Sequence, residues 1–341
     1  MDIGLATPLQ KDLHQSTSAI DSLTLLVSDD LARVNDLIIK RMDSAVSMIP
    51  DIAGYLIHSG GKRLRPLITL AAARLCGYHG KDHIKLAASV EFIHTATLLH
   101  DDVVDESALR RGHDSANVVW GNQASVLVGD YLFSRSFSLM VETGNLKVLD
   151  ILSRTSSIIA EGEVLQLVSS ADMKTSKKTY MEIVMCKTAA LFSAAARVGA
   201  VIADRPSHEE EALDAFGRNF GIAFQLVDDA LDYAGLQEQL GKTLGDDFRE
   251  GKITLPVVLA YARGTDEERA FWRRTMEKPA QQENDFSQAV ELLALHRSIK
   301  DTVDLAQDYA QKARDALMVL PNNCYRRSLD DLIAFCVDRA Y

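Results

Sequence analysis

The pattern Asp-Asp-x-x-Asp occurs twice in this chain, at Asp101–Asp105 and again at Asp228–Asp232. Residues i and i+4 of an α-helix lie on one face about 6 Å apart, so each motif places its first and last carboxylates together. At an effective dielectric constant of about 20, two such carboxylates repel each other by roughly 3 kcal/mol. Apolar residues on both sides of each motif predict partial burial, which adds a desolvation cost. A bound cation would offset both terms.

The chemistry of these side chains favours Mg²⁺ as that cation. Carboxylate oxygens suit a hard ion that keeps several waters and takes its remaining ligands from phosphate. Neither motif has a cysteine cluster or a histidine pair at ligand spacing beside it. A solvated acidic helix face is the alternative for either motif alone, whereas the repetition in an apolar context favours a metal site. The predicted metal ligands are Asp101, Asp102, Asp105, Asp228, Asp229 and Asp232.

Three sets of basic residues stand apart from the charged residues that are scattered along the exposed helix faces. The sets are Lys62 with Arg65, Arg110 with Arg111, and Lys187 with Lys242 and Lys252. The first set lies between two glycines, Gly60 and Gly61, and Pro66. This composition is typical of a turn that leads into the N-terminus of a helix, where anions bind. Each set alone is also compatible with a solvated surface. Together with the acidic motifs, they predict two phosphorylated substrates, one bound through metal and one bound directly by lysine and arginine.

Composition narrows the class of protein. The 341 residues are 47% hydrophobic and 25% charged, which is ordinary for a water-soluble domain. A net charge of −11 without a dense basic stretch argues against nucleic-acid binding. Four scattered cysteines predict free thiols in a reducing compartment. Because the first residues lack signal-peptide features and no uncharged apolar stretch reaches 18 residues, we expect a cytoplasmic protein without a membrane span.

The elements that must position these side chains are helices. Helix-starting and helix-stopping residues enclose apolar segments at 67–76, 82–105, 122–144, 146–169 and 179–203. Two further helices are predicted by capping-box spacing, at Ser207 with Glu210 and at Thr265 with Glu268. Strand patterns are nearly absent. We expect an all-α fold, a single-domain helical bundle over residues 1–341 around a central active-site cavity, with residues 1–20 loosely ordered.

One segment, Gly235 to Lys252, departs from regular helix. Four glycines interrupt its charged residues directly after the second aspartate motif. This composition predicts a mobile loop over the site. A plain surface loop is the alternative.

Five segments of the chain resemble the trans (all-E) polyprenyl diphosphate synthases. They are residues 60–66, 91–106, 110–112, 187–188 and 224–232. The resemblance covers nearly the whole chain and is strongest for the long-chain members that make ubiquinone side chains, the octaprenyl diphosphate synthases in particular. It implies an isoprenoid-synthase fold, a homodimer, and Mg²⁺-dependent condensation of isopentenyl diphosphate with an allylic diphosphate such as farnesyl or geranylgeranyl diphosphate.

The resemblance also implies a role for each matching residue. Asp101 and Asp105 would hold two Mg²⁺ ions and Asp228 a third, with the other three aspartates supporting through waters. The allylic diphosphate would meet Arg110, Lys187, Thr188, Gln225, Lys242 and Lys252. Isopentenyl diphosphate would meet Lys62, Arg65, His94 and Arg111. The residues implied to be catalytic are Asp101, Asp105, Asp228, Lys187 and Arg110.

Small residues before the first motif bear on product length. Thr97 and Ala96 lie four and five residues before Asp101, about 6–7.5 Å along a helix at ~1.5 Å per residue. The resemblance implies that aromatic side chains stop chain growth here in short-chain members, so the channel of this protein stays open past Ala96. Phe92 on the next turn and Phe133 on the helix across the channel are candidate floor residues. We expect an octaprenyl product, with a decaprenyl or shorter product as the alternative; simple packing of Ala96 and Thr97 against a neighbouring helix is the other interpretation.

Two other classes of protein share some of these features. A class I terpene synthase has aspartate-rich helices and uses Mg²⁺, but it lacks the second basic site that residues 60–66 predict. A non-catalytic subunit of a prenyltransferase complex typically loses aspartates, and this chain keeps both motifs. If the chain is a polyprenyl diphosphate synthase, we expect its apolar product to be delivered to a membrane, for quinone side chains.

Overall fold

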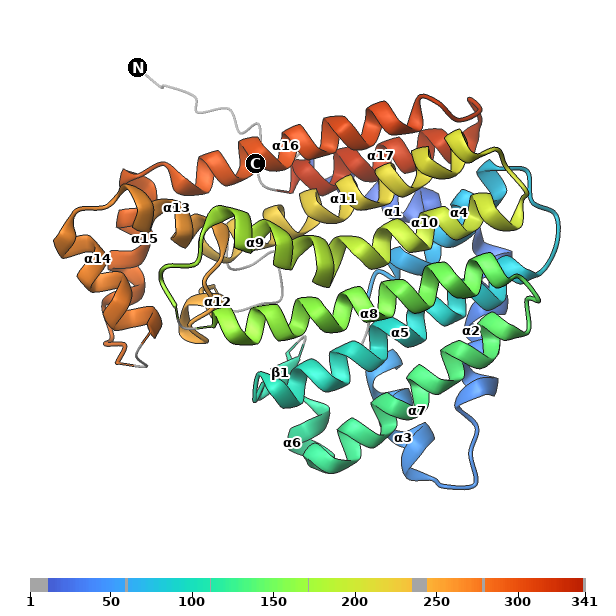
Figure 1. The fold of residues 1–341 in the computed structure, drawn as a ribbon, viewed down its shortest axis with the longest axis horizontal. Coiled ribbons are helices and arrows are strands. Elements are labelled where there is room, and N and C mark those ends of the chain that lie inside the picture. The colour runs from blue at the N-terminus through green and yellow to red at the C-terminus, as the bar shows by residue number, and fades with distance from the viewer. Residues whose placement is uncertain are drawn as a thin grey trace, which may run out of the picture.

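Most residues lie in long helices in the computed structural model (Figure 1). The structure describes residues 12–58, 61–110, 112–170, 172–234, 244–277 and 280–339. The first half contains α1 (Asp12–Leu26), α2 (Ser28–Met42), α3 (Met48–His58), α4 (Leu64–Leu75), α5 (Asp82–Val104), α6 (Ala116–Trp120), α7 (Asn122–Val141) and α8 (Leu146–Ser169). The second half contains α9 (Lys177–Val184), α10 (Ala190–Ile202), α11 (Ser207–Ala234), α12 (Asp246–Arg249), α13 (Leu255–Arg263), α14 (Asp266–Trp272), α15 (Asp285–Leu295), α16 (Ser298–Leu317) and α17 (Cys324–Asp338).

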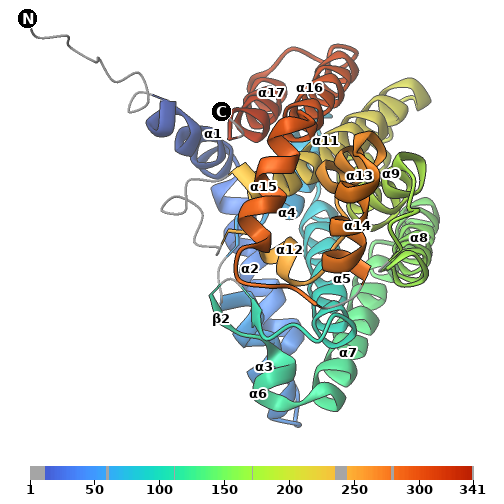
Figure 2. The same ribbon diagram turned by 90° about the vertical axis from the view of Figure 1, so that its left-hand side faces the viewer.

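The long helices lie side by side as a bundle. From α16 through α11, α10 and α5 to α7, each helix packs against the next (Figure 1). The end view shows α12, α14 and α15 together at one end of this bundle (Figure 2). The apolar core runs between the long helices, and a second buried cluster around Trp272 is formed mainly by side chains of α13, α14 and α15. The all-α prediction is confirmed.

Helix α10 is the central element. Its residues are buried on nearly every side, against α4, α5, α8 and α11. Two glycines allow the close approach: a Cβ at Gly199 would lie 2.6 Å from the backbone nitrogen of Ala73 on α4, and a Cβ at Gly217 on α11 would lie 2.3 Å from the carbonyl oxygen of Phe192. Any larger residue would have to push these backbones apart.

Within the described ranges, one helical segment, residues 177–202, is long and apolar enough to cross a membrane. In the structure, 61% of its apolar window is buried inside the molecule. The position of α10 in the bundle accounts for this composition, because a helix surrounded by other helices is apolar all round.

Several helix predictions need correction. The helix predicted over residues 179–203 is interrupted by the π-helical turn η1 (Met185–Ala189), and a second π-helical turn, η2 (Arg273–Glu277), follows α14. A short antiparallel pair, β1 (Leu109–Arg110) with β2 (His113–Asp114), follows the first motif and was not predicted. This hairpin needs only two residues a strand, too few for an alternating pattern to be visible in the sequence.

The two predicted capping boxes have different outcomes. At Thr265 the box is complete: its hydroxyl accepts the N–H of Glu268, and the Glu268 carboxylate accepts the N–H of Thr265. Helix α11 does begin at Ser207, but Glu210 directs its carboxylate to Lys147 and Arg197. Tertiary ion pairs thus replace the local contact.

Two expectations fall partly outside the described residues. Residues 1–20 are expected to be loosely ordered. The structure describes this segment from Asp12 onwards, where α1 begins. Of the segment Gly235 to Lys252, residues 244–252 are described, and they include α12.

Candidate active site

The two aspartate motifs lie at the ends of α5 and α11, and two segments join them. The turn η1 contributes Lys187, whose Nζ lies 3.8 Å from Asp101 of the first motif. The residue after it, Thr188, donates a hydrogen bond of 2.9 Å to Gln225 on α11. On the other side, residues 246–252 contact both motifs. The structure therefore brings together acidic groups that are more than a hundred residues apart in the chain.

Neighbouring aspartates of the first motif have different surroundings. The side chain of Asp101 is 17% exposed and faces Lys187. Asp102 is fully buried, and both of its oxygens accept hydrogen bonds of 2.8 Å from Arg110 Nε, with Arg110 Nη2 adding a further contact. Arg110 comes from β1, so the hairpin folds the chain back over the motif. Asp105 terminates α5 and lies 3.6 Å from Lys252 Nζ.

The second motif is held by α17, α9 and α12. Asp228 accepts a hydrogen bond of 3.1 Å from Arg339 Nη2. Asp229 is buried and accepts hydrogen bonds from the Tyr180 hydroxyl and, at 2.8 Å, from the Gln225 amide. Burial raises the pKa of Asp229 to about 6, against the opposing effect of these hydrogen bonds.

The last aspartate of this motif, Asp232, fixes the start of α12. It accepts the backbone N–H groups of Asp246 and Asp247 at 3.2 and 3.1 Å. Lys252 follows α12 and pairs with Glu250 at 2.6 Å as well as with Asp105. Although burial opposes its charge, Glu250 and Asp105 raise the pKa of Lys252. Residues 246–252 therefore run from the second motif, at Asp232, to a lysine that faces Asp105 of the first motif.

Adjacent residues of the turn η1 face different helices. A π-helical turn accommodates an extra residue and rotates the side chains that follow it, and such turns recur at functional sites. Here Lys187 points to α5 and α8, where its Nζ lies 2.7 Å from Glu163 and 3.1 Å from Gln166. Thr188 points to α11.

A second basic cluster gathers near the N-terminus of α4. Arg65 Nη1 lies 3.2 Å from His94 Nε2, and the guanidinium stacks over Phe192 at 4.3 Å from the ring centroid. The ammonium of Lys62 lies 4.7 Å from the ring of Phe335. Burial lowers the pKa of Lys62, and the positive charge of Arg339 adds to the shift. Arg111, which was predicted to join this cluster, and Lys242, which was predicted to contact the allylic diphosphate, lie outside the described residues.

Four residues of the site were missed from the sequence. Glu163 and Gln166 stand three apart on α8, a spacing that a search for polar pairs on an apolar helix would find. Tyr180 and Arg339 reach the second motif from distant elements. No local pattern identifies them, because only the folded chain places them beside α11.

The donor set fits a hard divalent cation. Burial raises the pKa of Asp101, and it raises the pKa of Glu163 to about 7, with the negative charges of neighbouring carboxylates contributing to both shifts. Glu163 Oε1 is buried without a hydrogen-bond partner. Over the described ranges, no three His, Cys, Asp or Glu side chains group tightly enough to hold an ion unaided. A cation bound here would take further oxygen ligands from water and phosphate, as hard ions do.

The residues predicted to set product length lie below the first motif. Ala96 and Phe92 are fully buried on α5. The hydroxyl of Thr97 turns back to the carbonyl of His94 at 2.8 Å. Phe133 on α7 is half-buried and packs edge-on against Phe137, with ring centroids 5.3 Å apart. Helices α5 and α7 pack along each other, so both sets of residues lie at one helix pair, and their role stays a prediction.

Comparison with known proteins gives one consistent set of relatives. The polyprenyl synthetase family profile matches residues 46–293. An octaprenyl diphosphate synthase from Haemophilus influenzae is 42% identical over 327 residues, 96% of this chain and 99% of that relative. The crystal structure of a decaprenyl diphosphate synthase from Rhodobacter capsulatus is 51% identical, with a TM-score of 0.91 over 94% of this chain and 99% of that one. The structure of a polyprenyl synthase from Caulobacter crescentus complexed with calcium and isoprenyl diphosphate is 54% identical, with a TM-score of 0.90 over 94% and 98% of the two chains.

Proposed function

This chain belongs to the polyprenyl synthetase family, and we propose how its site performs long-chain trans-prenyl transfer. The protein is a prenyltransferase that condenses isopentenyl diphosphate with an allylic diphosphate. One observation carries the assignment to this site: Lys187 and residues 246–252 join two acidic motifs, and a separate basic cluster lies at α4. That arrangement offers two anion sites of different chemistry.

The allylic diphosphate belongs at the acidic site. Divalent metal use is a property of the family, and a relative binds calcium together with isoprenyl diphosphate. We assign Mg²⁺ to Asp101, Asp105 and Asp228, about three ions as in the family. Bound metal supplies charge that stabilises a departing diphosphate. Lys187 and Lys252 add positive charge from the protein beside Asp101 and Asp105.

Isopentenyl diphosphate belongs at the basic cluster. Arg65 lies beside His94 and over the ring of Phe192, and Lys62, three residues earlier in the chain, lies over the ring of Phe335. Arg111 joins this set by family resemblance. Direct recognition by arginine and lysine suits a diphosphate that must stay intact while its double bond reacts.

The reaction follows from these positions. Charge neutralisation around the allylic diphosphate lets its C–O bond break, and the bonding pair leaves with the diphosphate. The double bond of isopentenyl diphosphate then forms the new C–C bond with the allylic cation. The released diphosphate takes the proton that restores the alkene. No nucleophilic serine or cysteine is required.

Product length is the finer part of the proposal. The relatives include octaprenyl and decaprenyl diphosphate synthases, and we assign an octaprenyl product made from farnesyl or geranylgeranyl diphosphate, for a quinone side chain. The small side chains of Ala96 and Thr97 before Asp101 support a long product, because the family resemblance places aromatic rings there in short-chain members. A decaprenyl product is the alternative.

The proposal includes a cytoplasmic homodimer that delivers its product to a membrane. All four cysteines are free thiols, as expected in a reducing compartment. Apolar side chains are exposed on α8, where Val164 and Leu167 are each 60% exposed and Val168 is 72% exposed. Such a group supports a protein contact, since monomers rarely expose contiguous apolar surface.

The test is to incubate the purified protein with labelled isopentenyl diphosphate, Mg²⁺ and either farnesyl or geranylgeranyl diphosphate, and to size the product by chromatography. We expect incorporation of label into long all-trans chains. Consumption of the allylic diphosphate without incorporation of isopentenyl diphosphate would indicate a terpene synthase instead. Activity only after a second subunit is added would contradict the self-sufficient enzyme.

A further inference from the structure

Three acceptors surround the ammonium group of Lys187. Its Nζ lies 2.7 Å from Glu163 Oε2, 3.1 Å from Gln166 Oε1 and 3.8 Å from Asp101 Oδ2. An ammonium group has three N–H donors. The two short contacts use two of them, so the remaining donor is left on the side of Asp101.

The two short contacts come from one face of α8. Residues three apart are neighbours on a helix surface, so Glu163 and Gln166 reach the same nitrogen. Gly162 lets the two elements approach: a Cβ there would lie 2.6 Å from the Cβ of Cys186 and 3.1 Å from the backbone nitrogen of Lys187. Residues 162–166 therefore set the distance between α8 and η1 and supply the acceptors.

The balance of charge explains why these acceptors matter. The side chains of Lys187, Glu163 and Asp101 are only 20%, 27% and 17% exposed, so solvent screens their charges weakly. Without Glu163, Lys187 would be drawn to the carboxylate of Asp101. That ion pair would compete with a cation for Asp101 and would turn the ammonium away from the substrate.

We infer that Glu163 and Gln166 are positioning residues, which hold Lys187 away from Asp101 and direct its free donor to the diphosphate of the allylic substrate. The inference rests on the proposed function, because that reaction supplies the diphosphate. Glu163 acts through Lys187, since its own negative charge would repel a diphosphate.

A double-mutant cycle tests this relation, with kcat/KM for the allylic diphosphate as the readout. Removal of a supporting contact of this kind lowers activity by about 10–100-fold, which is the effect expected for Glu163→Ala. In a Lys187→Ala background, the same change should cost less than about threefold, because coupled residues are not additive. The KM for isopentenyl diphosphate should not change. Glu163→Gln, which keeps an acceptor but loses the charge, should fall between the wild type and Glu163→Ala.

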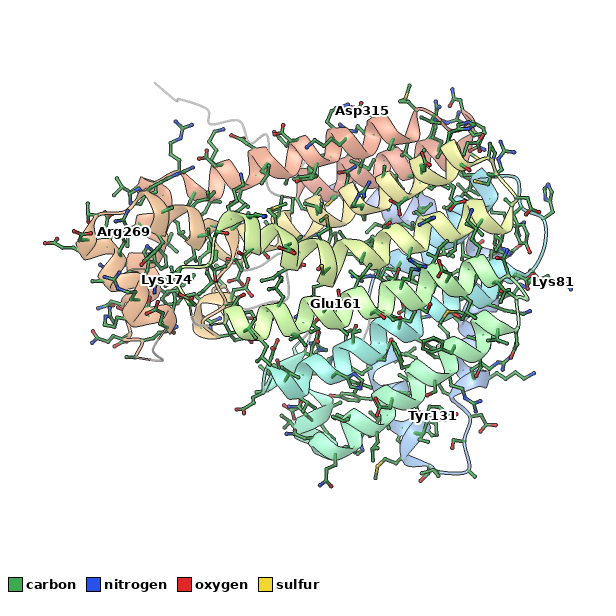
Figure 3. All side chains as sticks on the ribbon, viewed as in Figure 1. Lys81, Tyr131, Glu161, Lys174, Arg269 and Asp315 are labelled. Carbon is green, nitrogen blue, oxygen red and sulfur yellow. The ribbon has the colours of Figure 1, made fainter. Side chains whose placement is uncertain are left out.

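Glu161→Gln is the matched control. Glu161 lies on the same helix with its side chain on the surface (Figure 3), so this change removes the same charge without affecting Lys187. Its kcat/KM should equal that of the wild type. Thermal unfolding shows which variants are folded, and Glu163→Gln serves in the cycle should Glu163→Ala not fold.

Binding of inorganic diphosphate gives a readout that is independent of turnover. In calorimetry with Mg²⁺ present, Glu163→Gln should weaken this binding severalfold and Glu161→Gln should not. Equal losses of kcat/KM from the Glu163 change in both backgrounds, or unchanged diphosphate binding, would overturn the inference. If the wild type does not incorporate isopentenyl diphosphate, the proposed function fails; if it does and the cycle is additive, only the positioning role fails.

Discussion

At the scale of single residues, adjacent aspartates in one motif have different environments. Asp101 is partly exposed and faces Lys187, whereas Asp102 is fully buried against Arg110. A helix turns about 100° per residue, so neighbouring side chains point in different directions. The sequence pattern treats the two as equivalent, and only the contacts separate a group that faces the site from one that holds the hairpin in place.

Substitution of these two aspartates should therefore have different effects. Asp101→Ala is expected to lower turnover by on the order of a thousandfold or more, because it removes charge stabilisation at the departing diphosphate, and to leave the fold intact. Asp102→Ala is expected to cost about 1–3 kcal/mol of unfolding free energy, because Arg110 loses its buried partner. Steady-state kinetics and urea unfolding measure the two effects. Near wild-type Mg²⁺-dependent condensation by Asp101→Ala would contradict the metal site.

At the scale of elements, one buried carboxylate ties three helices together. Glu210 on α11 accepts hydrogen bonds of 2.9 and 2.7 Å from Arg197 on α10, and its other oxygen contacts Lys147 on α8. Burial acts to raise the pKa of Glu210, but these two basic partners prevail and lower it below its usual value of 4.5. The helices that carry η1 and the second motif are thus fixed to each other at their far ends.

This cluster predicts a pH dependence of stability. The pKa of Glu210 is lower in the folded state than in the unfolded state. The contribution of Glu210 to the free energy of unfolding is therefore present above about pH 4.5 and is lost as the pH falls through the folded-state pKa. Glu210→Gln should lower the free energy of unfolding by about 1–3 kcal/mol at pH 7, and the difference from wild type should narrow as the pH falls below 4.5.

Urea unfolding at pH 7 and at pH 3.5 to 4 measures this difference. The Arg154–Asp150 pair on the exposed surface of α8 provides a control, because solvent screens exposed pairs. Asp150→Asn should change stability little at either pH. If the free energies of unfolding of Glu210→Gln and the wild type differed by the same amount at both pH values, the ion pairs of Glu210 would not contribute to stability.

At the scale of the whole molecule, the residues predicted to set product length lie on the same helix as the first aspartate motif. Asp101 lies near the end of α5, and Ala96 is fully buried one to two turns below it. Helix α7, which carries Phe133, packs along α5. Chain growth would then be limited by the space that the packed helices leave, rather than by the chemistry of the motifs.

Ala96→Phe should shorten the product, because an aromatic ring at this depth would block the channel. Radiochromatography of the extracted chains measures the shift. Ala96→Ser, which keeps the residue small, should give the wild-type distribution. An unchanged distribution from Ala96→Phe in a folded, active variant would show that Ala96 only packs against a neighbouring helix.

The sequence by itself determined the helical class, the two acidic motifs and most of the basic residues around them. These features are local: helix periodicity, capping residues and i, i+4 spacing are set by backbone geometry. The complete capping box at Thr265 is an example, since all of its atoms lie within one turn.

Only the tertiary structure decided which charges meet. Glu163 and Tyr180 reach the site from α8 and α9, and Arg339 reaches it from the residue after α17. Glu210 forms ion pairs with distant helices in place of its predicted local contact. Contacts of this kind depend on how the long helices pack, and close approaches such as Gly162 against η1 determine that packing. The pairing of buried charges is therefore a property of the assembled bundle, because desolvation makes each charge take whichever partner the packing brings near.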